Sequence, residues 1–201
     1  KSLEVENDIA KIVKAASTIS GGIHPVVLSR GESECRGYRS PDLMRYFPTV
    51  TGEHYYSVDM GDYTLVNIDT AEDQVDNAPS RYGGRVKFAD LKAKQLEWIN
   101  SLSEGKLAVI SHIPLDSAPY CEAYQPVLKN KGAVVSLSGH TFNYSTSGSV
   151  SENSIYTITS GGYYYNNPNN FNSVSVLLSG DYAYINSKNY ADTAKDEAKT
   201  V

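Results

Sequence analysis

Apolar side chains recur near the start of the chain at the spacing of an α-helix. The stretch LEVENDIAKIVKAAS (3–17) places them on one stripe, which predicts an amphipathic helix that ends at Gly21-Gly22. The members of this stripe are Leu3, Ile9, Ile12, Val13 and Ala16. A second helix is predicted over residues 88–102, where the apolar positions are Leu91, Leu96, Trp98, Ile99 and Leu102.

Short apolar runs bounded by turn residues predict strands between the helices. HPVVLS (24–29) follows the first helix as a short buried strand. HYYSVDM (54–60) and YTLVNID (63–69) are predicted to pair as a hairpin around Gly61-Asp62. KLAVISH (106–112) and AVVSLSGH (133–140) are predicted as buried strands that each lead into a histidine.

The second half of the chain continues this alternation. CEAYQPVLKN (121–130) predicts a short helix broken by Pro126, and VSVLLSGDYAYINS (174–187) predicts a terminal hairpin. The polar stretch ADTAKDEAKTV (191–201) predicts a frayed helix or a disordered tail. The chain is therefore predicted to be one α/β domain over residues 1–190, followed by a polar tail over residues 191–201.

Composition narrows the class of protein further. The 201 residues contain 18 basic and 23 acidic side chains without basic clusters, which argues against a nucleic-acid partner. No apolar stretch approaches the length of a membrane-spanning helix. The chain begins at Lys1 and carries 16 tyrosines and the run YYYNNPNNFN (163–172), which favours a processed, exported protein located in the periplasm, on the cell surface or in the medium.

Polar side chains gather where three predicted strands end, at residues 30–36, at His112 and at Gly139-His140. In open α/β sheets this edge binds ligands. A single histidine here more often caps a backbone carbonyl, but two histidines in matched positions favour a metal site. His24 and His54 are interpreted as structural.

Two other groups of residues suggest binding, and each has a simpler interpretation. Asp69, Asp73 and Asp76 lack the glycine and the closing glutamate of a calcium-binding loop, so a solvated loop is predicted. The tyrosines of residues 163–165 either stack on a sugar or a base, or pack against one another.

Five sequence blocks carry a resemblance to a known family. They are VVLSRGESECRG (26–37), YYSVDMGDYTLVNIDTAED (55–73), AKQLEWINSL (93–102), LAVISHIPL (107–115) and LSGHTFNY (137–144). In this order and spacing the chain resembles the calcineurin-like metallophosphoesterases, particularly their bacterial exported, purple-acid-phosphatase-like branch. The resemblance implies two packed mixed β-sheets flanked by helices, with two divalent metal ions at the sheet edge for phosphoric ester hydrolysis.

The family motifs assign roles to particular residues. His112 and His140 match metal ligands of the motifs S/H-H-x-P and G-H-x-H, and Arg36 in the loop motif R-G-N-H-E-x-R-G is a candidate to bind substrate. Glu32 replaces the metal-binding Asn of that loop and could still act as a ligand. Ser33 replaces the histidine that acts as the acid, and Phe142 replaces the second histidine of G-H-x-H.

The resemblance also implies that strands of the family domain are missing from this chain. The family begins with D-x-H and G-D-x-x-D motifs on two strands, and the helix at Leu3 corresponds to the one that follows them. An N-terminal fragment of the same protein is therefore a candidate partner that would complete the sheet.

Three functions remain open. The favoured one is a metallophosphoesterase domain with an incomplete di-metal site, inactive or very weak, that holds no metal or one weakly bound ion. The first alternative is an active phosphomonoesterase or phosphodiesterase completed by an N-terminal segment, and the second is a non-catalytic surface binding module. Whether the chain is an enzyme is left undecided by the sequence.

The two cysteines allow two states. Their small number slightly favours free thiols. The family architecture places the loops of Cys35 and Cys121 beside the same site, which shifts the prediction to a disulfide. Such a bond would close a loop of about 86 residues. The chain-entropy model assigns it about 4–5 kcal/mol of stability against unfolding.

Overall fold

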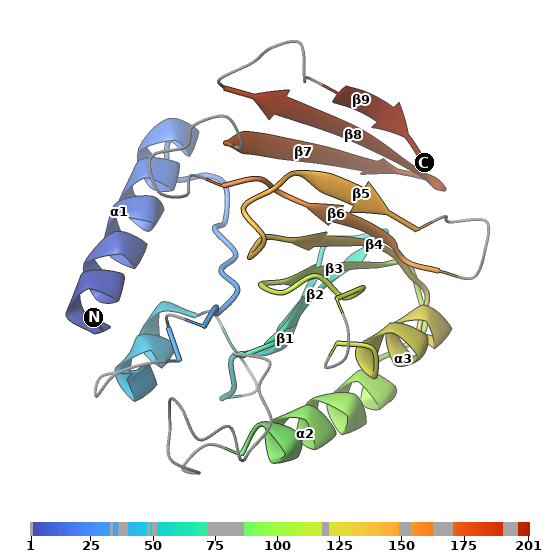
Figure 1. The fold of residues 1–201 in the computed structure, drawn as a ribbon, viewed down its shortest axis with the longest axis horizontal. Coiled ribbons are helices and arrows are strands. Elements are labelled where there is room, and N and C mark those ends of the chain that lie inside the picture. Colours follow the sequence, from blue (N-terminus) through green and yellow to red (C-terminus); the bar gives the residue numbers. More distant parts are fainter. Residues whose placement is uncertain are drawn as a thin grey trace.

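The computed structural model describes residues 2–32, 34–35, 40–47, 49, 52–71, 87–117, 121–148, 154–162, 171–190 and 197–201, with the backbone alone for residues 2–6. The described residues form two β-sheets with helices on the outer sides (Figure 1). None of the described helices is long and apolar enough to cross a membrane.

The larger sheet has six strands in the order β1-β2-β3-β4-β6-β5. The central strands β2, β3, β4 and β6 are parallel, whereas the edge strands β1 and β5 are antiparallel to their neighbours. The bounds are β1 Tyr56–Asp59, β2 Thr64–Ile68, β3 Leu107–Ser111, β4 Ala133–Ser138, β5 Ser145–Ser147 and β6 Tyr156–Thr159. The parallel centre directs the carboxyl ends of β2, β3 and β4 to one edge of the sheet.

The smaller sheet is antiparallel and consists of β7 (Asn172–Ser179), β8 (Tyr182–Asn189) and β9 (Glu197–Thr200). It packs on one face of the larger sheet through a shared apolar cluster that includes Val135, Tyr156 and Ile185. The alternating burial along β8 follows from the two-residue period of a strand, because every second side chain points toward the larger sheet.

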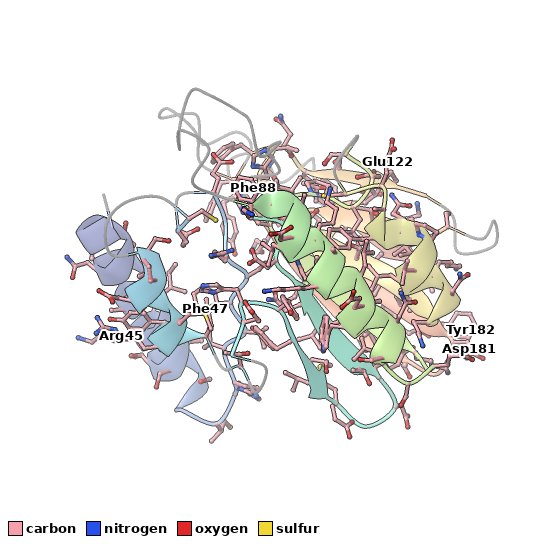
Figure 2. The ribbon with its side chains drawn as sticks, turned by 90° about the horizontal axis from the view of Figure 1, so that it is seen from below. Arg45, Phe47, Phe88, Glu122, Asp181 and Tyr182 are labelled. Carbon is pink, nitrogen blue, oxygen red and sulfur yellow. The ribbon has the colours of Figure 1, made fainter. Side chains whose placement is uncertain are left out.

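Two helices cover the opposite face of the larger sheet. These are α2 (Phe88–Ser101) and α3 (Tyr124–Asn130), drawn side by side in Figure 2. Ile99 of α2 and Leu128 of α3 are fully buried in the main apolar cluster, together with Val66 and Val109 of the sheet. Burial of these side chains supplies the main hydrophobic stabilisation of the domain.

The first helix is packed less completely. The helix α1 (Ser2–Ser20) contacts the 3-10 helix η1 (Ser40–Tyr46), where Ile9, Leu43 and Phe47 form a small buried cluster. Ile12 remains 54% exposed and Ile19 87% exposed. The predicted apolar stripe of α1 is thus covered only in part by the described residues.

The predicted fold class is confirmed: the chain is α/β, with two sheets flanked by helices. The predicted hairpin is β1-β2, the predicted helix over 88–102 is α2, and the predicted terminal hairpin is β7-β8. The smaller sheet differs from the expected mixed sheet, because all its described pairings are antiparallel. The division at residue 190 stays a prediction.

The strand predicted over HPVVLS does not form. The segment pairs with no described strand, although β1 and β7 are edge strands of the two sheets. The segment is held instead by other contacts: the Tyr56 hydroxyl donates to the Leu28 carbonyl, and the Ser29 hydroxyl donates to the Ile68 carbonyl.

Two further expectations on secondary structure are wrong. Pro126 does not break α3 but lies in its first turn, where the backbone N–H that proline lacks has no partner within the helix. The tail is neither helical nor frayed at its end, because residues 197–200 form β9 and Val201 exchanges two backbone hydrogen bonds with Ala183. Residues 191–196 lie outside the described residues.

The predicted disulfide is also wrong, since neither Cys35 nor Cys121 takes part in a disulfide. Cys121 is buried in the apolar cluster beneath α2 and α3. Cys35 belongs to the loop after Arg30, and its Sγ donates to the Gly31 carbonyl at 3.2 Å. Export, which the disulfide would have supported, stays a prediction.

Candidate metal centre

Two histidines lie where neighbouring parallel strands end. His112 directly follows β3, and His140 lies two residues beyond β4. The Gly139 N–H donates to the His112 carbonyl at 3.1 Å, which ties the two strand ends together. The sheet topology therefore brings together two residues that are 28 positions apart in the sequence.

A carboxylate from a third segment joins the two imidazoles. One oxygen of Glu32 lies 3.1 Å from Nδ1 of His140, and Nε2 of His112 lies 3.2 Å from the same nitrogen. The ligand atoms of Glu32, His112 and His140 all lie within 4.8 Å of one another. The three metal ligands predicted from the sequence are thus adjacent in the structure.

Hydrogen bonds alone do not satisfy this arrangement well. Nδ1 of an imidazole carries either one proton or one lone pair, yet Nδ1 of His140 is within hydrogen-bond distance of two partners. A cation placed among the three atoms would accept a lone pair from each of them. The three atoms are therefore placed where they could hold a cation.

The backbone of His140 has a conformation that a non-glycine residue rarely adopts. Its φ is +69°, and Phe142 two residues later has φ +60°. Left-handed backbone at non-glycine residues costs free energy and is concentrated at functional sites. Here it turns the chain sharply after β4 and sets the position of the His140 ring.

Gly31 allows the loop with Glu32 to approach His112 closely. A β-carbon at Gly31 would lie 3.0 Å from two ring atoms of His112 and 2.9 Å from a carboxylate oxygen of Glu34. That same oxygen accepts a hydrogen bond from the Gly31 N–H at 2.9 Å. Glu34 thus fixes the loop backbone, and glycine is the residue that fits beside the imidazole.

A buried ion pair anchors the residue before this glycine. Both carboxylate oxygens of Asp69 accept hydrogen bonds from the Arg30 guanidinium. Gln95 of α2 holds the backbone of Asp69, because its side chain accepts from the Asp69 N–H and donates to the Asp69 carbonyl. The same side-chain amide of Gln95 also donates to the Tyr124 hydroxyl of α3.

Asp69 was expected in a solvated loop, and this expectation is wrong because the residue is 1% exposed. Sequence reasoning missed the roles of both Asp69 and Gln95. Asp73 and Asp76 lie outside the described residues. His54 is buried and packs edge-on against Phe47, as its structural interpretation predicted.

Burial favours the neutral state of one candidate ligand. The pKa of His112 is lowered, mainly by burial and also by the neighbouring His140, while the charge of Glu32 acts in the opposite direction. A neutral imidazole is the form that binds a metal ion. His112 is therefore suited to act as a ligand at neutral pH.

Three other predicted features have different outcomes. Ser33, at the position of the family acid, and Arg36, the candidate substrate-binding residue, lie outside the described residues, as do the tyrosines of 163–165. Phe142 is 41% exposed, and its ring packs against Gly162 so closely that a β-carbon added to this glycine would touch the ring. It contributes no ligand atom to the cluster.

Comparison with solved structures agrees with this arrangement of sheets and helices. The whole chain superposes on 80% of the chain of a dimetal phosphatase from Danio rerio, with a TM-score of 0.65 and 14% sequence identity. The chain has a calcineurin-like fold. No family model matches the sequence, and no curated protein is significantly similar to it. The likeness therefore concerns the calcineurin-like fold, and what the site binds depends on its own residues.

Proposed function

We propose that Glu32, His112 and His140 hold a single divalent metal ion on this calcineurin-like fold, and that the 201-residue chain hydrolyses phosphate esters weakly or not at all. The observation that carries the proposal is the convergence of three ligand atoms from separate segments on one point.

The spacing of these atoms fits one ion. Nitrogen and carboxylate ligands lie about 2.0–2.2 Å from Zn²⁺, so two ligands in tetrahedral geometry are separated by about 3.2–3.6 Å. The separations of 3.2 Å between His140 and His112 and 3.1 Å between His140 and Glu32 are close to this range. The third separation, between Glu32 and His112, is within 4.8 Å, so a bound ion would draw these two side chains together where it exceeds the tetrahedral range.

Two ions would require more ligands than this cluster provides. A two-metal site holds its ions about 3.5–4 Å apart and needs ligands for both. The described residues contain no second group of His, Cys, Asp and Glu side chains placed to hold a metal. Phe142 also supplies no ligand where the family has a histidine.

The residues present would bind a phosphate ester better than they cleave it. A bound divalent ion polarises a phosphoryl oxygen and lowers the pKa of a metal-bound water. Protonation of the leaving alkoxide also requires an acid near neutral pKa. Ser33 stands at that position of the family motif, and a serine hydroxyl does not give up its proton at neutral pH.

The experiment is titration of the metal-free chain with Zn²⁺ by calorimetry, followed by elemental analysis after gel filtration. One ion per chain is expected. His112→Ala and His140→Ala should each abolish binding, whereas His24→Ala, at an exposed histidine outside the cluster, should leave it unchanged. Two tightly bound ions, or undiminished binding by His112→Ala, would refute the proposal.

We also propose a partner for this fold: a further polypeptide segment that adds strands beside residues 25–29. These residues are half-buried or exposed and belong to none of the strands that the structure describes, and the outer edge of β7 pairs with none of the described strands either. A groove of about 400 Å³ lies beside them, lined by Val13 of α1, by Val26 and Leu28, and by Phe47. Figure 1 shows this segment between α1 and the sheets.

Amide hydrogen exchange would test this partner. The 201-residue chain should exchange the amides of residues 26–29 rapidly. A version extended by the residues that its gene encodes upstream should protect them. Equal exchange in both versions would refute the proposal without affecting the metal site.

A further inference from the structure

A second, largely apolar cavity lies at the end of the sheets away from the histidines. Its volume is about 200 Å³, and its apolar wall includes Val135 of β4, Leu178 of β7 and Ala183 of β8. Lys106, which also lines it, immediately precedes β3, whereas His112 immediately follows that strand. The cavity and the metal cluster are thus about 20 Å apart, since a strand advances about 3.3 Å per residue.

The polar side of this cavity is built around one lysine. The Lys106 ammonium donates to the Gly180 carbonyl and to a carboxylate oxygen of Asp181, both at 2.7 Å. The Tyr63 hydroxyl donates to the same Gly180 carbonyl at 2.7 Å. Lys106 and Tyr63 therefore hold the turn between β7 and β8 against the larger sheet, and a cation lies where the cavity meets solvent.

The anion that neutralises this cation can be exchanged. The Asp181 side chain is 86% exposed and that of Lys106 is 42% exposed. Exposed ion pairs contribute little to stability, so another carboxylate can replace Asp181 beside Lys106 at little cost. Figure 2 places Asp181 and Tyr182 at the surface, at the opposite end of the molecule from Arg45 and Phe47.

The volume limits the size of the ligand. A dry cavity of about 150 Å³ accommodates benzene, so a cavity of this size suits a ring or short chain slightly larger than benzene. Cavities with apolar walls and a few fixed polar groups are typical of small-molecule sites. The apolar wall selects the body of the ligand, and Lys106 selects its charge.

We propose that this cavity binds a small carboxylic acid with an aromatic or short aliphatic body. The body lies against Val135, Leu178 and Ala183, and the carboxylate replaces Asp181 as the partner of Lys106. The site is independent of the metal cluster and of the function proposed for it.

Phenylacetate is a suitable probe, with 2-phenylethanol as its uncharged counterpart. The full 201-residue chain would be titrated with each compound while methyl resonances are followed by two-dimensional NMR. Saturable shifts are expected for the methyl groups of Val135, Leu178 and Ala183, with phenylacetate binding more tightly than the alcohol. No saturable shift up to about 10 mM, a concentration that detects even very weak ligands, or shifts confined to other methyl groups, would overturn the proposal.

Two substitutions at the cavity mouth should have opposite effects. Lys106→Met keeps the aliphatic stem and removes the charge, so it should weaken phenylacetate binding about tenfold and leave the alcohol unchanged. Asp181→Asn removes the competing carboxylate and should strengthen phenylacetate binding about two- to fivefold. Lys188→Met, at an exposed lysine of β8 outside the cavity lining, is the matched control.

The opposite signs expected for the two substitutions distinguish an effect on ligand binding from damage to the fold. Damage to the fold would weaken binding in both variants, whereas an adjustable anion site predicts one loss and one gain. If Lys106→Met binds phenylacetate as well as the unmodified chain, the assignment of the carboxylate to Lys106 is wrong.

Discussion

Arg30 and Asp69 form a buried, bidentate ion pair that links the loop of Glu32 to the carboxyl end of β2. Asp69 is 1% exposed, and a third hydrogen bond reaches its carboxylate from the Ala71 N–H at 3.0 Å. The segment that carries Arg30 belongs to no strand. This ion pair therefore holds the Arg30 segment in place, as hydrogen bonds between strands hold the segments of the sheets.

Asp69→Asn should destabilise the domain and weaken metal binding together. Removing one partner of a buried ion pair leaves the other charge uncompensated, which costs about 3–5 kcal/mol. The loop of Glu32 also loses its anchor, so Zn²⁺ affinity should fall while His112 and His140 stay in place. Urea unfolding and calorimetric titration measure the two effects. Asp90→Asn, which removes an exposed ion pair with Lys87, should change neither by a measurable amount.

Gly31→Ala tests the close approach of the loop to His112. The added methyl group would lie 2.9–3.0 Å from Glu34 and the His112 ring, so the loop must shift. Overpacking of this kind costs about 1–3 kcal/mol, and we expect Zn²⁺ affinity to fall by about tenfold or more. Gly105→Ala, where no atom lies within 4 Å of the new methyl group, should bind metal normally. Unchanged Zn²⁺ affinity in Gly31→Ala would mean that the loop does not carry a metal ligand.

His54 should make the protein less stable in mild acid. Burial, with a smaller contribution from the charge of Arg30, lowers the pKa of His54 to about 3. Between pH 6.5 and about 3 the unfolded chain therefore binds a proton that the folded chain does not, and the free energy of unfolding falls by about 1.4 kcal/mol per pH unit. His54→Phe keeps the edge-on contact with Phe47 and should remove this decline. Urea unfolding from pH 7 to pH 4 measures the slope, and a slope equal to that of the unmodified chain would contradict the prediction.

Hydrolysis of p-nitrophenyl phosphate by the Zn²⁺-loaded chain should be negligible, close to that of the metal-containing buffer. Combining Glu32→Asn, Ser33→His and Phe142→His should not restore activity in the 201-residue chain, because the ligands of a second ion are still missing. Turnover of more than about 1 s⁻¹, within the usual range of enzymes, would show that the active alternative is correct. Release of p-nitrophenol measures the hydrolysis rate of the unmodified chain and of the triple variant.

The parts of the fold that local sequence determines were predictable. Helix α2 has a clear 3.6-residue period, and the β1-β2 hairpin has a turn at Gly61, whose φ of +86° suits glycine. The positions of His112 and His140 followed from a rule of topology, because parallel neighbouring strands deliver their ends to one edge.

The failures concern features that depend on distant partners. HPVVLS has the composition of a strand, but a strand also needs a neighbouring strand to pair with, and no local pattern reports whether one lies beside it. Glu197–Thr200 is exposed throughout and has no apolar alternation, so only its pairing with β8 makes it a strand. Asp69 looked solvated because its partner Arg30 is 39 residues away.

The pairing of Val201 with Ala183 has a practical consequence for anyone who produces this protein. An affinity tag attached after Val201 would leave from a residue whose N–H and C=O are both held in the smaller sheet, beside the cavity that Lys106 borders. A tag before Lys1 would leave from α1, whose described packing is confined to η1 and its surroundings. For the 201-residue chain, the end at Lys1 is therefore the better place for a tag, a fluorophore or attachment to a surface.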